Sequence, residues 1–201
     1  MRPAVLLAVL AALAAGASVA LQGPLPGDVA ATRALQSALG HAPAWADWLT
    51  DTAKAPLLWG TLMVAALLAW RCGGWRGAVA VPLAYAFAFG ADMALRAVLS
   101  VPRPDPALVA VTAPAASSGL PSTFGLVYGA LLGAALLLPG ASRRAHPARL
   151  AAGVLLLAGA TARIVLGGHW PSQMLASVAF GLLLAIAAGA VIRRLPVSAR
   201  A

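Results

Sequence analysis

The sequence predicts an all-α fold, an integral membrane bundle of about six transmembrane helices. Hydrophobic residues make up 62% of the chain and charged residues only 9%, whereas soluble domains carry roughly a quarter charged residues. The apolar residues gather in six stretches, separated by short segments that hold most of the charge. A chain of 201 residues is therefore expected to form a single membrane domain.

The six apolar stretches cover residues 4–20, 55–70, 77–99, 124–139, 150–167 and 174–192. Several approach the ~20 residues that span the hydrocarbon core, and local bilayer thinning accommodates shorter ones. Each should be helical because lipid satisfies no backbone hydrogen bond. We divide the domain into a first helix with an outer interfacial segment (1–54), a core (55–192) and a cytoplasmic tail (193–201).

Residues 1–20 have two interpretations. Arg2, the apolar run after it and the ending Ser18-Val19-Ala20 also resemble a secretory signal peptide. Cleavage would leave five helices in the same orientation. We favour retention, because a multi-pass protein needs no separate signal.

Residues 21–54 form the longest outer segment, in which Asp28 to Leu39 predicts a short interfacial helix. Tryptophans near both interfaces are typical of aromatic belts. The outer set is Trp45, Trp48 and Trp59, and the inner set is Trp70 and Trp75.

Small residues recur at four-residue spacing in two stretches and predict close helix packing within the bundle. The sets are Gly125, Gly129 and Gly133, and Gly181, Ala185 and Gly189. The single cysteine, Cys72, excludes an intrachain disulfide and a cysteine-based metal site.

The basic residues predict the orientation. The net charge is +9, but no basic run is long enough to favour nucleic acid as a partner. With a cytoplasmic N-terminus, the inner segments hold Arg2, Arg71, Arg76, Arg143, Arg144, Arg149, Arg193, Arg194 and Arg200. All five acidic residues, Asp28, Asp47, Asp51, Asp92 and Asp105, fall in the outer half. The positive-inside rule then predicts a bacterial-type inner-membrane protein with both termini cytoplasmic.

Polar residues collect at the predicted outer ends of the helices, where they are costly and therefore functional suspects. Asp92 and Arg96 lie one turn apart, and Arg103 follows them. The other members are Ser122 and Thr123 at the start of the fourth helix, Arg163 at the end of the fifth, and His169.

This cluster predicts an anion site that faces the periplasm or exterior. Asp92 can neutralise Arg96 through their i,i+4 relation, which leaves an excess of positive charge. Guanidinium groups bind phosphate or carboxylate oxygens, and a helix start with free N–H groups favours an anion as well. His169 is a candidate nucleophile. Nothing in the pattern implies a metal or cofactor.

Three segments resemble the motifs of the type 2 phosphatidic acid phosphatase family, over roughly residues 60–192. Residues 96–104 read RAVLSVPRP and resemble K-x6-R-P, with Arg96 for the lysine. Residues 120–124 read LPSTF and resemble P-S-G-H, and residues 162–173 read ARIVLGGHWPSQ and resemble S-R-x5-H-x3-D. The resemblance implies a six-helix bundle whose site faces outward.

The resemblance also implies roles for individual residues. Phosphate oxygens would be held by Arg96, Arg103, Ser122 and Arg163, and His169 would become phosphohistidine. Four positions depart from the motifs. Phe124 replaces the histidine that protonates the leaving group, and Gln173 replaces the aspartate that orients the nucleophile. Thr123 replaces a glycine, and Ala162 a serine.

Two functions follow. The first is a lipid phosphate or pyrophosphate phosphatase, for which a pyrophosphate is favoured because its leaving group needs a general acid least. Polyprenyl pyrophosphate is the example we expect. In this enzyme, Gln173 would accept a hydrogen bond from the imidazole of His169. An acid could also come from the outer loop, where His41 is the one histidine. The second is a membrane protein that binds lipid phosphates with weak catalysis or none.

Overall fold

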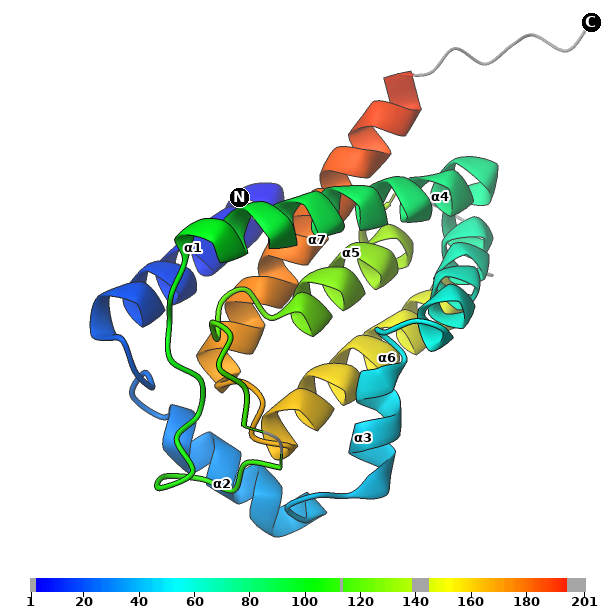
Figure 1. The fold of residues 1–201 in the computed structure, drawn as a ribbon. Helices are drawn as coiled ribbons and strands as arrows, with labels where there is room; N and C mark the ends of the chain where they lie inside the picture. The colour runs from blue at the N-terminus through cyan, green and yellow to red at the C-terminus, as the bar shows by residue number, and fades with distance from the viewer. Residues whose placement is uncertain (1–2, 113, 139–144, 195–201) are drawn as a thin grey trace, which may run out of the picture.

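The computed structural model describes residues 3–112, 114–138 and 145–194. Over these residues the secondary structure is entirely helical (Figure 1). The helices are α1 (Pro3–Leu21), α2 (Asp28–Leu39), α3 (Ala44–Asp51), α4 (Leu57–Val98), α5 (Thr123–Leu137), α6 (Ala145–Val165) and α7 (Pro171–Arg194). By length and composition, α1, α4, α6 and α7 can each cross a membrane, and α5 is a shorter apolar helix.

Helix α4 consists of two arms that pass through the bundle in opposite directions. Its 42 residues include Gly74, whose φ of 63° and ψ of −155° are not helical, and the chain turns sharply there (Figure 1). A side chain at Gly77 would collide with the Ala69 carbonyl of the other arm. Counting both arms with α1, α5, α6 and α7 confirms the prediction of about six spans.

Helix α5 lies in the middle of the bundle, where nearly all of its residues are buried (Figure 1). Its predicted small face packs on that of α7. A Cβ at Gly129 would lie 2.6 Å from the Val178 carbonyl oxygen, and one at Gly133 would lie 2.8 Å from the Ala185 Cβ. The spacing of small residues therefore serves packing inside the bundle, as predicted.

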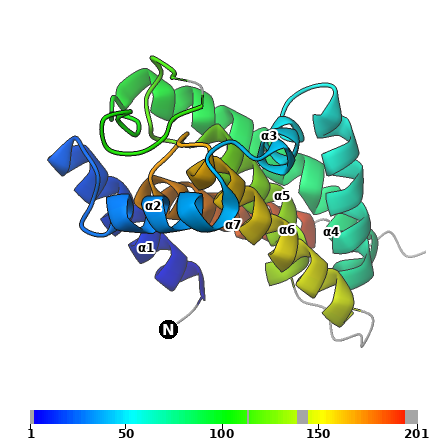
Figure 2. The same cartoon turned by 90° about the horizontal axis from the view of Figure 1, so that it is seen from below.

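Helices α2 and α3 cover the end of the bundle at which α6 ends and α7 begins (Figure 2). The predicted helix over Asp28–Leu39 is present. The side chains that it buries against the rest of the protein are polar. The Asp28 carboxylate accepts from the Ser172 backbone N–H at 2.9 Å. The Gln36 amide donates to the Ala110 and Val165 carbonyls at 2.7 and 2.9 Å.

The two ends of the bundle differ in charge as predicted. The acidic residues lie in the segments around α2, α3 and the end of α4, whereas Arg71, Arg76, Arg149, Arg193 and Arg194 belong to the opposite helix ends. Arg2, Arg143, Arg144 and Arg200 lie outside the described residues. Helix α7 continues to Arg194, beyond the predicted start of the tail at 193; the rest of that segment lies outside the described residues.

Candidate active site

A cavity of about 280 Å³ lies where the outer ends of α3, α4, α5 and α6 meet the loops before α5 and α7. It is lined by Thr50, Ala53, Lys54, Arg96, Arg103, Thr123, Phe124, Arg163 and His169. None of these described lining residues is acidic. The fold thus brings together five of the predicted site residues from three distant segments.

Arg96 is fixed by a network that includes two other predicted residues. Its Nε donates to Asp92 at 3.0 Å, and its Nη2 donates to the Thr123 hydroxyl at 2.6 Å and the Pro121 carbonyl at 2.8 Å. The Thr123 hydroxyl donates to the second Asp92 oxygen at 3.0 Å. Thr123, where the family motif has glycine, therefore holds the cation in place.

Arg103 is fixed against the loops and against His169. Its guanidinium donates to the Ser117 carbonyl and hydroxyl, at 2.8 and 2.9 Å, and to the Gly168 carbonyl at 2.9 Å. Burial and the nearby charges of Arg163 and Arg96 lower the pKa of Arg103 to about 10. It remains a cation at neutral pH.

His169 is buried and presents one ring nitrogen to the cations. Its Nδ1 lies 2.9 Å from the Gly119 carbonyl oxygen, which can only accept, so Nδ1 carries a proton. Its Nε2 lies 3.2 Å from Arg103 Nη1. Burial and the charges of Arg163 and Arg103 hold the His169 pKa well below 6.5, against a smaller raising effect of the Gly119 hydrogen bond. At neutral pH, Nε2 therefore carries no proton, and its lone pair faces Arg103 Nη1.

Arg163 brings a partly buried guanidinium to the cavity. Its Nε is buried without a hydrogen-bond partner among the described residues. A Cβ at Gly168 would lie 2.7 Å from Arg163 Nη2, so the guanidinium packs directly on the Gly168 backbone and would have to shift for a larger residue. A buried N–H without an acceptor is costly, and a phosphate oxygen in the cavity would supply one for Nε.

Gln173 does not have the position predicted for it. Its Oε1 accepts from the Trp170 N–H at 3.2 Å, and its Nε2 donates to the Pro102 carbonyl at 2.8 Å. The imidazole bond expected of Gln173 is made by the Gly119 carbonyl instead. Pro102 precedes Arg103 and Trp170 follows His169, so the buried amide ties together the two loops that carry these residues.

Ser122 also differs from its prediction. Its hydroxyl accepts from the Gly125 N–H at 3.3 Å and so caps α5. Its own N–H donates to the Ser177 hydroxyl at 2.8 Å. The residue is fully buried and lies outside the lining of the cavity. Its contribution is to fix the start of α5, which positions Thr123 and Phe124.

The position of the family's general acid is apolar. The Phe124 ring stacks on Tyr128 with centroids 4.1 Å apart, and a Cβ at Gly159 would lie 2.6 Å from Phe124 Cζ. His41 does not substitute for the missing histidine, because it lines a different pocket together with Arg33 and Gln36.

Sequence reasoning missed residues whose contributions depend on distant contacts. Gly119 and Ser117 act through backbone or hydroxyl groups in an irregular loop. Thr50 and Lys54 reach the cavity because α3 packs beside α6. No motif marks these positions.

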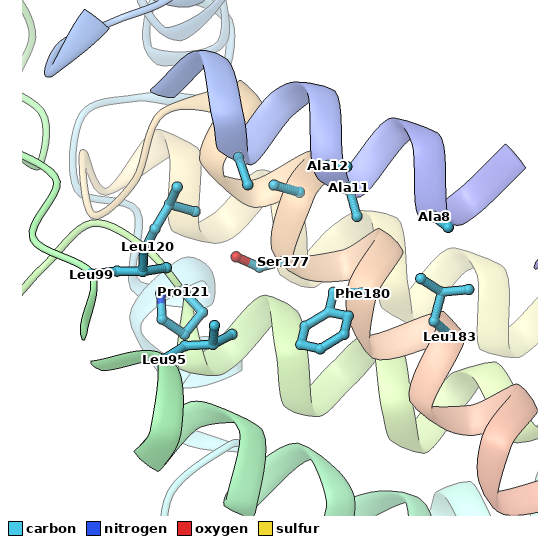
Figure 3. A pocket seen from close by; sticks show the side chains of 12 residues that line it. Ala8, Ala11, Ala12, Leu95, Leu99, Leu120, Pro121, Ser177, Phe180 and Leu183 are labelled. Atoms are coloured by element: carbon cyan, nitrogen blue, oxygen red, sulfur yellow. The ribbon is translucent and has the colours of Figure 1, made fainter. Parts of the chain in front are cut away.

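Two apolar pockets adjoin the site. One, of about 360 Å³, lies between α1, α7 and the end of α4 (Figure 3). Pro121 lines it, and Arg96 bonds the Pro121 carbonyl on the cavity side. The other, of about 280 Å³, includes Thr52 and Tyr128 in its lining and adjoins the Phe124 side of the cavity.

The fold is that of a type 2 phosphatidic acid phosphatase. The chain is similar to the crystal structure of the first transmembrane PAP2 type phosphatidylglycerolphosphate phosphatase from Bacillus subtilis, with a TM-score of 0.71 and 19% identity over 98% of each chain. No family model and no curated protein matches the sequence. The resemblance seen in the three motifs is thus confirmed at the level of the fold, and the chain is a multi-pass membrane protein.

Proposed function

We propose that this protein is a lipid phosphate or diphosphate phosphatase that works through a phosphohistidine on His169. The observation that carries the proposal is the cavity itself. Arg96, Arg103 and Arg163 line it with the buried His169, and Arg163 has an orphaned Nε. A phosphoryl group supplies the anion and the acceptors that such a cavity lacks.

The reaction follows from the geometry. The lone pair of His169 Nε2 attacks phosphorus while the arginines stabilise the charge on the phosphoryl oxygens. The bond from phosphorus to the leaving oxygen breaks, and that oxygen keeps the electron pair. Water then attacks the phosphohistidine, the P–N bond breaks, and inorganic phosphate leaves.

The Gly119 carbonyl compensates in part for the absent aspartate. It holds the tautomer in which Nε2 is free to attack, so Gln173 does not impose the wrong tautomer. A neutral carbonyl stabilises an imidazolium less than a carboxylate does. The nucleophile is thus correctly oriented but receives less electrostatic support.

A lipid diphosphate suits this site best. Phe124 cannot donate a proton, and a diphosphate releases a phosphate monoester that needs a proton less than an alkoxide does. The apolar pocket beside Tyr128 can hold a hydrocarbon chain on that side. Polyprenyl diphosphate is the substrate class that we propose, and the charge asymmetry favours a site on the extracytoplasmic face.

The second candidate is a lipid-phosphate-binding protein without turnover. The observation that favours it is the Phe124–Tyr128 stack at the general-acid position. The cations that hold phosphate are retained in that case, and only the chemistry is lost.

Phosphate release by the purified protein in nanodiscs tests the proposal. The substrates are polyprenyl diphosphate, phosphatidic acid and a soluble alkyl phosphate. We expect release in the order diphosphate, phosphatidic acid, soluble ester, and an acid-labile phosphoenzyme that His169→Ala abolishes. Equal release by wild type and His169→Ala would contradict the mechanism. If neither protein releases phosphate but both bind the lipid diphosphate, the binding function is correct.

A further inference from the structure

The cavity holds a fourth cation that none of the three motifs contains. Lys54 lines it together with Thr50 and Ala53, from the segment that joins α3 to α4. Thr50 is buried, and its hydroxyl has no partner among the described residues. This segment therefore adds a donor and a cation to the cavity wall.

Contacts place this segment beside Phe124. The Phe124 ring stacks on Tyr128, and the Tyr128 hydroxyl is hydrogen-bonded to the hydroxyl of Thr52. Thr52 is two residues from Lys54. Lys54 therefore approaches the cavity from the side on which the general acid is missing.

The backbone around Lys54 is held in position. The Lys54 N–H donates to the Asp51 carbonyl at 2.9 Å, and the Lys54 carbonyl accepts from the Leu58 N–H at 2.8 Å. The Thr61 hydroxyl donates to the Thr52 carbonyl at 2.7 Å. The side chain itself is exposed, and its Nζ lies 2.7 Å from Asp51 Oδ1. An anchored backbone with an exposed ammonium, paired only with the exposed Asp51 carboxylate among the described residues, suits a group that must reach a substrate and return to its counter-ion.

We propose that Lys54 serves the leaving group of the reaction, in the role that Phe124 cannot fill; this inference rests on the proposed phosphatase function. When His169 Nε2 bonds to phosphorus and the P–O bond breaks, the leaving oxygen takes a proton from the Lys54 ammonium. The resulting amine accepts a proton from the water that attacks the phosphohistidine, which restores the ammonium. Thr50 donates a hydrogen bond to the same side of the substrate.

A pair of substrates that differ in their leaving group tests this role. p-Nitrophenyl phosphate releases a stable phenolate, whereas an alkyl phosphate releases an alkoxide that needs a proton. We expect Lys54→Ala to lower kcat on the alkyl ester by about 10²-fold, as loss of a general acid does, and to change kcat on the aryl ester less than about 3-fold. Lys54→Arg keeps the charge but holds its proton, so it should not rescue the alkyl ester.

The aryl ester also reports whether the variant is folded, because its hydrolysis needs His169 and the arginines. The matched control is Arg33→Ala, another basic residue of the same face, which bonds the Leu108 carbonyl away from the cavity. It should leave the ratio of the two rates unchanged. Equal loss on both esters, no loss on the alkyl ester, or full rescue by Lys54→Arg would overturn the role of Lys54 alone. Failure of the wild type on both esters and on the lipid diphosphate would overturn the phosphatase function itself.

Discussion

The two sides of the cation-lined cavity are built in opposite ways. On the phosphate side, Arg96 and Arg103 each bond to backbone carbonyls, and His169 is fixed by Gly119. On the side that we assign to the leaving group, Phe124 stacks on Tyr128, and the exposed Lys54 pairs with Asp51.

On the proposed mechanism, holding a phosphoryl group and handling protons are separate structural tasks. The first needs several cations at fixed positions, which requires many hydrogen bonds from buried loops. The second needs one donor that reaches the leaving oxygen, and more than one segment of the chain can supply it. Loss of the second-motif histidine therefore leaves the phosphate side intact.

The largest expected effect is on the phosphate side, at Arg163. On the proposed mechanism, Arg163→Gln removes a cation that stabilises the transition state, and we expect kcat/KM to fall by about 10²–10³-fold on any phosphate ester. Because its Nε makes no hydrogen bond with the described residues, the thermal unfolding temperature should fall little. Steady-state assays and thermal unfolding measure the two quantities. Unchanged activity would mean that the guanidinium only fills space.

Gln173→Met tests whether the geometry of the phosphate side depends on the buried hydrogen bonds that join its two loops. The change keeps the volume but removes the bonds to Pro102 and Trp170. The Arg103–His169 spacing should relax, and because a misplacement of about 1 Å costs ~10²-fold, kcat should fall by that order. The control is Gln36→Met, a second buried amide that joins loops away from the cavity. A comparable loss of kcat in both variants would assign the effect to general destabilisation.

Phe124→His should make the leaving-group side more like the phosphate side, because it places a polar group there. Imidazole is smaller than the phenyl ring that packs against Gly159 and Tyr128, and it can donate a proton. We expect turnover of phosphatidic acid to rise by about 10-fold, below the ~10²–10⁴ of an optimised general acid, with little change on a lipid diphosphate. Phe124→Leu serves as the control for space alone. A gain in Phe124→Leu, or none in Phe124→His, would contradict the assignment of this position.

The smallest effect is a shift in pH dependence. Because the His169 pKa lies below 6.5, His169 should be neutral in the free enzyme at pH 6.5. The acidic limb that its protonation causes in the pH profile of kcat/KM should therefore lie below pH 6.5. Arg103→Gln removes one of the charges that lower this pKa, so the limb should move to higher pH. Profiles of kcat/KM against pH for wild type and Arg103→Gln measure this shift, and Arg33→Gln is the control. A limb that stays in place or moves down would exclude His169 as the group that titrates.

The same lowered pKa has a consequence for folding. The unfolded chain binds a proton at this histidine near pH 6.5, while the folded chain does not. The unfolded state therefore binds more protons below that pH, and this contribution to stability is lost as pH falls.

The sequence by itself determined the membrane bundle and the cluster of residues that we propose to hold phosphate. Long apolar stretches permit little besides helices in lipid, and charged side chains at their ends are rare enough to stand out. Arg96, Arg103, Arg163 and His169 were predicted for this reason and line one cavity. The four-residue spacing of small residues likewise predicted the contact between α5 and α7.

Only the tertiary structure decided how those residues are held and what faces them. Gly119 orients His169, Gln173 ties two loops, and Lys54 enters from a segment far away in the chain. A backbone carbonyl or a flexible lysine has no sequence pattern of its own, because its role depends on which loop packs beside it. The helices and charges are properties of local sequence, whereas the proton-handling side arises from contacts between segments distant in the chain.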